Sequence, residues 1–213
     1  MEAFVKPMEG LAEYEEIRKS LTENRGILQV AGCLDSQKAH WLYGLSDLHD
    51  CRLVVAEDDQ KAKEFYEDNR FYQPDTLLYP AKDLLFYYAD IQGNLLTKQR
   101  MRVIRGILEK KKVTVVTSME GCMERLRPLQ EIAASRLHLT NESSLNLEKL
   151  LKDLTSLGYE RAGQIERSGQ FCVRGGIVDI YSLTEENPWR IELWGDEVDS
   201  IRSFDVESQR SLE

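Results

Sequence analysis

The sequence predicts an α/β protein in two parts, a parallel-sheet domain followed by a small α+β domain with an antiparallel sheet. Two observations carry this prediction. From residue 10 to about residue 120, stretches with the period of a helix alternate with short apolar runs, which is typical of a mostly parallel sheet covered by helices. After about residue 135, strand-like segments follow one another with only short turns between them, and strands connected in this way pair as antiparallel hairpins.

The first part is expected to consist of repeated βα steps. Helices are predicted over residues 11–21, 37–48, 58–71 and 95–112, and strands over residues 26–32, 51–56, 75–79 and 113–118. Pro80 closes the third of these strands, because proline has no N–H to donate to a sheet. The run VTVVTS at 113–118 is the clearest buried strand of the chain.

The second part is expected to pack one helix on a small sheet. A helix is predicted over residues 145–158, with leucines on one face and Gly158 at its end. Strands are predicted over residues 170–175, 177–182, 189–195 and 197–204. The domains are therefore predicted as 1–135 for the α/β part and 136–203 for the small α+β part, with 204–213 as the start of a segment that returns to the first domain.

Composition excludes several classes of function. The 213 residues carry a formal net charge of −9, so the chain lacks the basic excess of a domain that holds a phosphate backbone unaided, and a protein partner is expected instead. Four scattered cysteines without a C-x-x-C pair indicate reduced thiols, so neither a metal nor another cofactor is expected. No apolar run has the length of a membrane helix and no signal peptide is visible. We expect a cytoplasmic monomer with no membrane partner.

Residues 32–39, GCLDSQKA, half fulfil the pattern of a phosphate-binding loop. Gly32 and Lys38 are in register with G-x-x-x-x-G-K-[ST], but Gln37 stands at the second glycine and Ala39 at the magnesium-binding hydroxyl. Glutamine lacks the freedom of glycine at positive φ, and alanine cannot bind magnesium. We interpret the loop as a degenerate P-loop that is not expected to bind nucleotide. A working ATPase, or a glycine and lysine with no such ancestry, are the alternatives.

The most specific pattern lies between Gly169 and Glu213. It comprises the Arg174-Gly175 pair, an apolar-Asp-apolar strand, a proline before an aromatic-arginine strand, and the ending Phe204-Asp205 through Gln209-Arg210. This segment closely resembles a stretch shared by UvrB and the bacterial transcription-repair coupling factors, and the ending is closer to the coupling factors. UvrB would carry an intact phosphate-binding loop, so the degenerate loop also favours the coupling factors. The resemblance implies their amino-terminal, UvrB-like part, with a helicase-like first domain.

This resemblance also implies a function. In the family the small domain binds the repair protein UvrA, which recruits nucleotide excision repair to stalled RNA polymerase, and this part of the protein makes or breaks no bond. By position, the UvrA-binding residues correspond to Arg174, Arg190 and Trp194, although phenylalanine is commoner at the last position. RNA polymerase and DNA would be bound only through the rest of the full-length protein, which resembles an ATP-dependent DNA translocase.

The residues themselves support part of this assignment. Alternation along residues 189–194 places Arg190, Glu192 and Trp194 on one face of a strand. Arg174 is expected to reach the same face if a bulge resets the alternation. The alternative is that both arginines only pair with Glu192 or Asp179 on a solvated face, and that Trp194 covers the small core.

Two further alternatives concern the first domain. The chain could be a fragment of a UvrB-like ATP-dependent helicase in which Lys38 binds the β-phosphate, a reading that Gln37 and Ala39 disfavour. It could also bind DNA directly through the basic helix of residues 98–112, a reading that the overall acidity disfavours.

Overall fold

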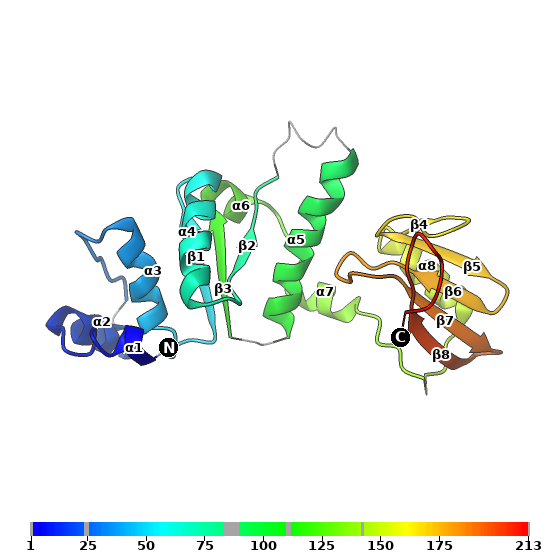
Figure 1. Ribbon diagram of the computed structural model, residues 1–213, viewed down its shortest axis with the longest axis horizontal. Helices are drawn as coiled ribbons and strands as arrows, with labels where there is room; N and C mark the ends of the chain where they lie inside the picture. The colour runs from blue at the N-terminus through cyan, green and yellow to red at the C-terminus, as the bar shows by residue number, and fades with distance from the viewer. Residues whose placement is uncertain (1, 24–25, 83–89, 110–111, 142, 213) are drawn as a thin grey trace. The chain divides into compact units, whose positions relative to one another are not determined.

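The computed structural model describes residues 2–23, 26–82, 90–109, 112–141 and 143–212. The chain forms two compact units, Met1–Leu126 and Arg127–Glu213, whose elements are labelled in Figure 1. The predicted fold class is confirmed, because the first unit holds a parallel sheet with helices and the second a mixed, mostly antiparallel sheet. The finer division into 1–135, 136–203 and 204–213 stays a prediction. No helix within the described ranges is long and apolar enough to cross a membrane.

The first unit is built around a parallel sheet of three strands in the order β1-β3-β2. Its strands are β1 (Cys51–Ala56), β2 (Leu77–Tyr79) and β3 (Val113–Ser118), and its helices are α1 (Glu2–Val5), α2 (Ala12–Thr22), α3 (Asp35–Gly44), α4 (Asp59–Tyr72), α5 (Asp90–Leu108) and α6 (Met119–Met123). The central strand β3 is buried along its whole length, as its apolar run predicts. Its Val113 and Val115 pack with Tyr79 and Val103 in the core of this unit.

The strand predicted over residues 26–32 is wrong. These residues form no helix or strand, and Ile27 is fully exposed to solvent. The chain adopts positive φ at both ends of the segment, 93° at Gly26 and 82° at Gly32, so both ends turn where a strand would run straight. A short apolar run becomes a strand only where a neighbouring strand accepts its backbone hydrogen bonds, and residues 26–32 pair with no strand among the described residues.

The second unit packs a helix on a sheet of five strands. Its elements are α7 (Leu129–Ala134), α8 (Leu147–Ser156), β4 (Glu160–Arg161), β5 (Gln170–Arg174), β6 (Ile177–Ile180), β7 (Trp189–Trp194) and β8 (Glu197–Ser203). The strands lie in sequence order, and all neighbouring pairs are antiparallel except β4 and β5. The two-residue strand β4 was not predicted from the sequence.

Helix α8 has the predicted apolar face. The Asn146 side chain accepts a hydrogen bond from the Lys149 N–H at the start of the helix, which satisfies a backbone donor that the helix leaves free. Gly158, at φ 87°, follows its end. Leu150 and Leu154 are buried against one face of the sheet, where they meet Phe171, Val178 and Ile191. This packing leaves the other face of the sheet for polar side chains.

Candidate partner-binding face

The face of the five-stranded sheet opposite α8, which we call the outer face, is lined by charged side chains. Successive residues of a strand point to opposite faces, whereas residues paired across strands share a face. Cys172, Asp179, Arg190 and Arg202 form one row across β5 to β8, and Arg174, Ile177, Glu192 and Ser200 form the next. Ile191 points the other way into the core, as the alternation of residues 189–194 predicts.

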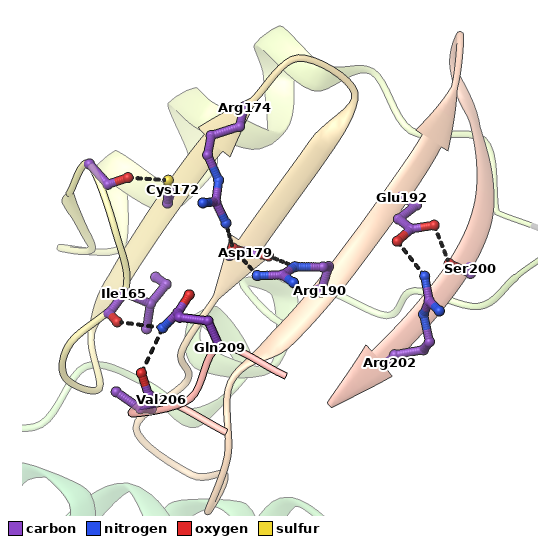
Figure 2. Close-up of polar contacts among 11 residues, drawn as sticks. Ile165, Cys172, Arg174, Asp179, Arg190, Glu192, Ser200, Arg202, Val206 and Gln209 are labelled. Atoms are coloured by element: carbon purple, nitrogen blue, oxygen red, sulfur yellow. Dashed lines mark hydrogen bonds and ion pairs between the residues drawn. The ribbon is translucent and has the colours of Figure 1, made fainter. Parts of the chain in front are cut away.

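Arg174 and Arg190 converge on the carboxylate of Asp179 (Figure 2). Arg190 binds it through two atoms, with Nε 2.7 Å from Oδ1 and Nη2 3.0 Å from Oδ2. Arg174 donates from Nη2 to Oδ2 at 2.7 Å. The Asp179 side chain is only 1% exposed. We call these three residues the arginine clamp.

Arg190 is held on two sides. Its guanidinium lies over the ring of Phe204, 4.5 Å from the ring centroid, a distance at which a cation is attracted to the π-face. The hydrogen bonds that Arg190 donates to Asp179 raise the pKa of Arg190 above its usual value, while partial burial opposes that shift. With 16% of its side chain exposed, Arg190 offers a partner only a small surface.

Arg174 reaches the outer face without the bulge that the sequence analysis expected. The register of β5 and β6 runs unbroken from Phe171 opposite Ile180 to Arg174 opposite Ile177. Gly175 and Gly176 alone join the two strands, with φ 62° at Gly175, so alternation places Arg174 diagonally across from Asp179. The irregularity of the sheet lies elsewhere, in the pairing of β7 with β8 after Glu192. Half of the Arg174 side chain is exposed.

Trp194 ends strand β7 and is 83% exposed. The alternative that it covers the small core is therefore wrong.

The alternative in which both arginines only pair with acidic residues on a solvated face holds in part. Both arginines do bind Asp179, but the carboxylate of Asp179 is buried and not solvated. Glu192 instead binds Arg202 and accepts a 3.1 Å hydrogen bond from Ser200. Trp194 and Arg174 are both well exposed, and tryptophan and arginine are the residue types that contribute most often to binding energy in protein interfaces.

The Phe204-Asp205 to Gln209-Arg210 pattern forms a turn beside the clamp. Asp205 Oδ1 accepts hydrogen bonds from the backbone and hydroxyl of Ser208, and these bonds lower the pKa of Asp205. Gln209 adopts φ 58°, and its amide donates to the carbonyls of Val206 and Ile165 (Figure 2). The turn places Phe204, which is fully buried, in a second cluster with Ile165 and Cys172. This sequence pattern therefore supports the ring on which Arg190 lies.

The residues of the degenerate phosphate loop lie in the first unit, and their polar groups bind one another. Lys38 Nζ lies 2.7 Å from Asp35 Oδ1, and this hydrogen bond lowers the pKa of Asp35. The Gln37 side chain accepts a 2.9 Å hydrogen bond from the Leu34 N–H, at the helix start where an anion would otherwise be bound. Gly32 follows no strand, because the predicted strand before it does not form.

Sequence reasoning missed part of the outer face. It named Asp179 only as a possible surface partner, and it did not single out Arg202. The signal was available, because the two-residue turn after Arg174 fixes the register and places Asp179 beside both arginines. Within the described residues, no cluster of histidine, cysteine or carboxylate side chains has the arrangement of a metal site.

The sequence of this chain is similar to those of known proteins. Residues 137–213 match the family model of the UvrB interaction domain. The transcription-repair-coupling factor of Bacillus subtilis strain 168 is 37% identical over 137 residues, which are 64% of this chain and 12% of that protein. The chain is therefore similar to part of the transcription-repair-coupling factors, with a UvrB interaction domain over residues 137–213. The transcription-repair-coupling factors from Staphylococcus aureus strain USA300 and Staphylococcus haemolyticus strain JCSC1435 are 34% and 35% identical over 133 residues, which cover 62% of this chain.

The chain spans only a small part of these coupling factors, 11% of the length of each of the two staphylococcal proteins. The matched UvrB interaction domain includes the whole arginine clamp, Phe204 and Trp194. It thus contains all three residues predicted to bind a partner, and the degenerate phosphate loop lies outside it.

Proposed function

We propose that the second unit is a non-catalytic UvrA-binding module, which recruits nucleotide excision repair to stalled RNA polymerase. The single observation that carries the proposal is the outer face itself. Arg174 and Arg190 converge on Asp179 there, and Trp194, which alternation along β7 places on the same face, is 83% exposed. Arginine and tryptophan supply bidentate hydrogen bonding and large rigid contact area, the two properties that concentrate binding energy in few residues.

The three residues have different parts in this proposal. Arg174 and Trp194 are exposed enough to contact UvrA directly. Arg190 contributes a smaller exposed surface, and its larger part is to complete the clamp that holds Asp179. RNA polymerase and DNA would be bound by other parts of the full-length proteins.

The degenerate loop of the first unit supports the wider proposal that the chain as a whole is non-catalytic. Lys38 is paired with Asp35, and Gln37 occupies a backbone donor at the start of α3. An ATP-dependent helicase fragment would need these groups for the nucleotide. ATP titrated with magnesium into the chain should therefore give no binding heat, and saturable binding abolished by Lys38→Ala would favour the helicase reading.

UvrA binding is tested by calorimetric titration of the chain into purified UvrA. Arg174→Ala and Trp194→Ala should each weaken binding by roughly tenfold or more, as removal of central interface residues does. Arg190→Ala should also weaken it. Arg18→Ala is the matched control, because Arg18 likewise donates from both ends of its guanidinium to one carboxylate, that of Asp47 in the first unit, and it should bind as the unchanged chain does.

Thermal unfolding of each variant separates lost binding from lost folding. A folded unchanged chain that does not bind UvrA would refute the proposal. Binding that is indifferent to all three substitutions would refute the site while leaving UvrA as the partner.

A further inference from the structure

We infer that Asp179 is the positioning residue of the outer face, which holds Arg174 and Arg190 ready for carboxylates of the partner. The inference rests on the proposed UvrA binding and deepens it. Asp179 is nearly fully buried, so it cannot itself contact a partner to any extent. In the folded chain, Asp179 therefore acts on binding through the groups that it contacts, the two arginines.

The geometry gives Asp179 this role. Both of its oxygens are used, since Oδ1 accepts from Arg190 and Oδ2 accepts from both arginines. The three donors come from strands on either side of β6, so a single carboxylate fixes the separation of two guanidinium groups (Figure 2). Charge-assisted bonds of this kind are stronger and more directional than neutral ones.

Holding the arginines in advance favours binding. A long side chain that is free in solution loses rotamer freedom when a partner immobilises it, and this loss opposes association. In this protein Asp179 and the Phe204 ring restrict Arg190 before any partner arrives. Asp179 restricts Arg174 through one hydrogen bond, while half of that side chain still faces solvent.

The charges of the clamp indicate the chemistry of the partner. Two guanidinium groups share one carboxylate, which leaves one positive charge in excess. The carboxylate of Glu192 on the same face binds Arg202 and Ser200 instead. A partner that presents an aspartate or glutamate to Arg174 would neutralise the excess charge, and Arg174 would then bridge a carboxylate from each protein.

The test titrates Asp179→Asn and Asp179→Glu variants of the whole chain into UvrA. We expect each to weaken binding by roughly tenfold or more, because the arginines lose their fixed separation. Asp179→Glu keeps the charge and moves the oxygens, so a loss in this variant shows that position matters. Asp47→Asn is the matched control, since Asp47 also accepts from an arginine through both of its oxygens but lies in the first unit, and its affinity should stay within about twofold of the unchanged chain.

A double-mutant cycle separates positioning from a general effect on the fold. In the Arg174→Ala background, Asp179→Asn should weaken binding by a smaller factor than in the unchanged chain, because one of its two targets is gone. An equal factor in both backgrounds would overturn the inference. So would folded Asp179 variants that bind as the unchanged chain does, and in that case losses in Arg174→Ala and Trp194→Ala would still uphold UvrA binding.

A measurement on the unchanged chain keeps the inference testable should both variants fail to fold. Nitrogen relaxation of the arginine Nε–H groups should show Arg190 ordered like the backbone of β7. If Arg190 is instead as mobile as a fully solvated arginine, the inference is overturned. A chain that does not bind UvrA at all would remove the proposed function and this inference together.

Discussion

Two ion pairs of equal length, one in each unit, differ in what surrounds them. Lys38 and Asp35 lie 2.7 Å apart with 54% and 74% of their side chains exposed, whereas Arg190 and Asp179 lie 2.7 Å apart with 16% and 1% exposed. Water competes for the first pair and is excluded from most of the second, so only the second is expected to hold its groups in place. The sequence identifies charged candidate residues in both units. The extent of burial determines which of their side chains are held in a fixed position.

The largest effect should come from the ring beneath the clamp. Phe204→Ala removes a fully buried ring from the cluster with Ile165 and Cys172 and should cost the second unit about 3–5 kcal/mol of unfolding free energy. Amide hydrogen exchange reads the two units separately, and protection should fall in β5 to β7 and not in β1 and β3. Equal loss in both units would contradict the separate stability of the second unit.

A smaller effect should distinguish the two arginines of the clamp. Arg190→Ala leaves the buried Asp179 with one partner and should cost about 2–3 kcal/mol of unfolding free energy. Arg174→Ala removes one hydrogen bond from a half-exposed side chain and should cost at most about 1 kcal/mol. Urea unfolding of both variants measures the difference. A larger loss of unfolding free energy in Arg174→Ala than in Arg190→Ala would show that burial does not determine the relative strength of these two ion pairs.

The pair of the first unit should contribute little. Lys38→Ala should change the unfolding free energy by no more than about 0.5 kcal/mol, because the substitution lies on a solvated helix face. Urea unfolding of Lys38→Ala measures this change. A cost above about 1 kcal/mol would mean that Lys38 makes a structural contribution that its exposure does not indicate.

The smallest expected effect is a change in the pKa of one carboxyl group, that of Asp35. The hydrogen bond and charge of Lys38 hold the pKa of Asp35 below its ordinary value of 3.8, so Lys38→Ala should return it toward that value. A carboxyl group whose pKa is lowered in the folded state stabilises that state fully at a pH above the ordinary pKa. Any stabilisation by Asp35 is therefore lost as the pH falls from 3.8 through the lower pKa of the folded state. Carbon NMR of the carboxyl group measures the pKa, and an unchanged pKa in the variant would show that Lys38 is not its cause.

Much of the fold followed from periodicity in the sequence. The leucine face of α8 and the antiparallel strands β5 to β8 were predicted, because each buries a face with its own regular spacing. The strand over residues 26–32 failed for the same reason that β4 was missed. Both depend on whether a neighbouring strand lies alongside, and a short window of sequence does not contain that information.

The candidate site was predictable to a similar degree. Alternation placed Arg190 and Trp194 on one face of β7, opposite the buried Ile191. The convergence of two arginines on Asp179 depends on the register between three strands, which the spacing within any one strand does not reveal. The resemblance named both arginines but gave no reason for their separation, and the structure supplies one in the buried carboxylate.

The order of the five strands also bears on how quickly each unit reaches its native state. In the second unit, β5 to β8 are joined in sequence order through antiparallel neighbours, so each pairing closes a short loop. In the first unit, β1 pairs with β3 and brings Cys51 beside Val113, which closes a loop longer than any between successive strands of the second. Pairing two strands that are close in the sequence costs less chain entropy than pairing two strands that are far apart. The sheet that carries the arginine clamp should therefore assemble faster than the parallel sheet that precedes it in the chain.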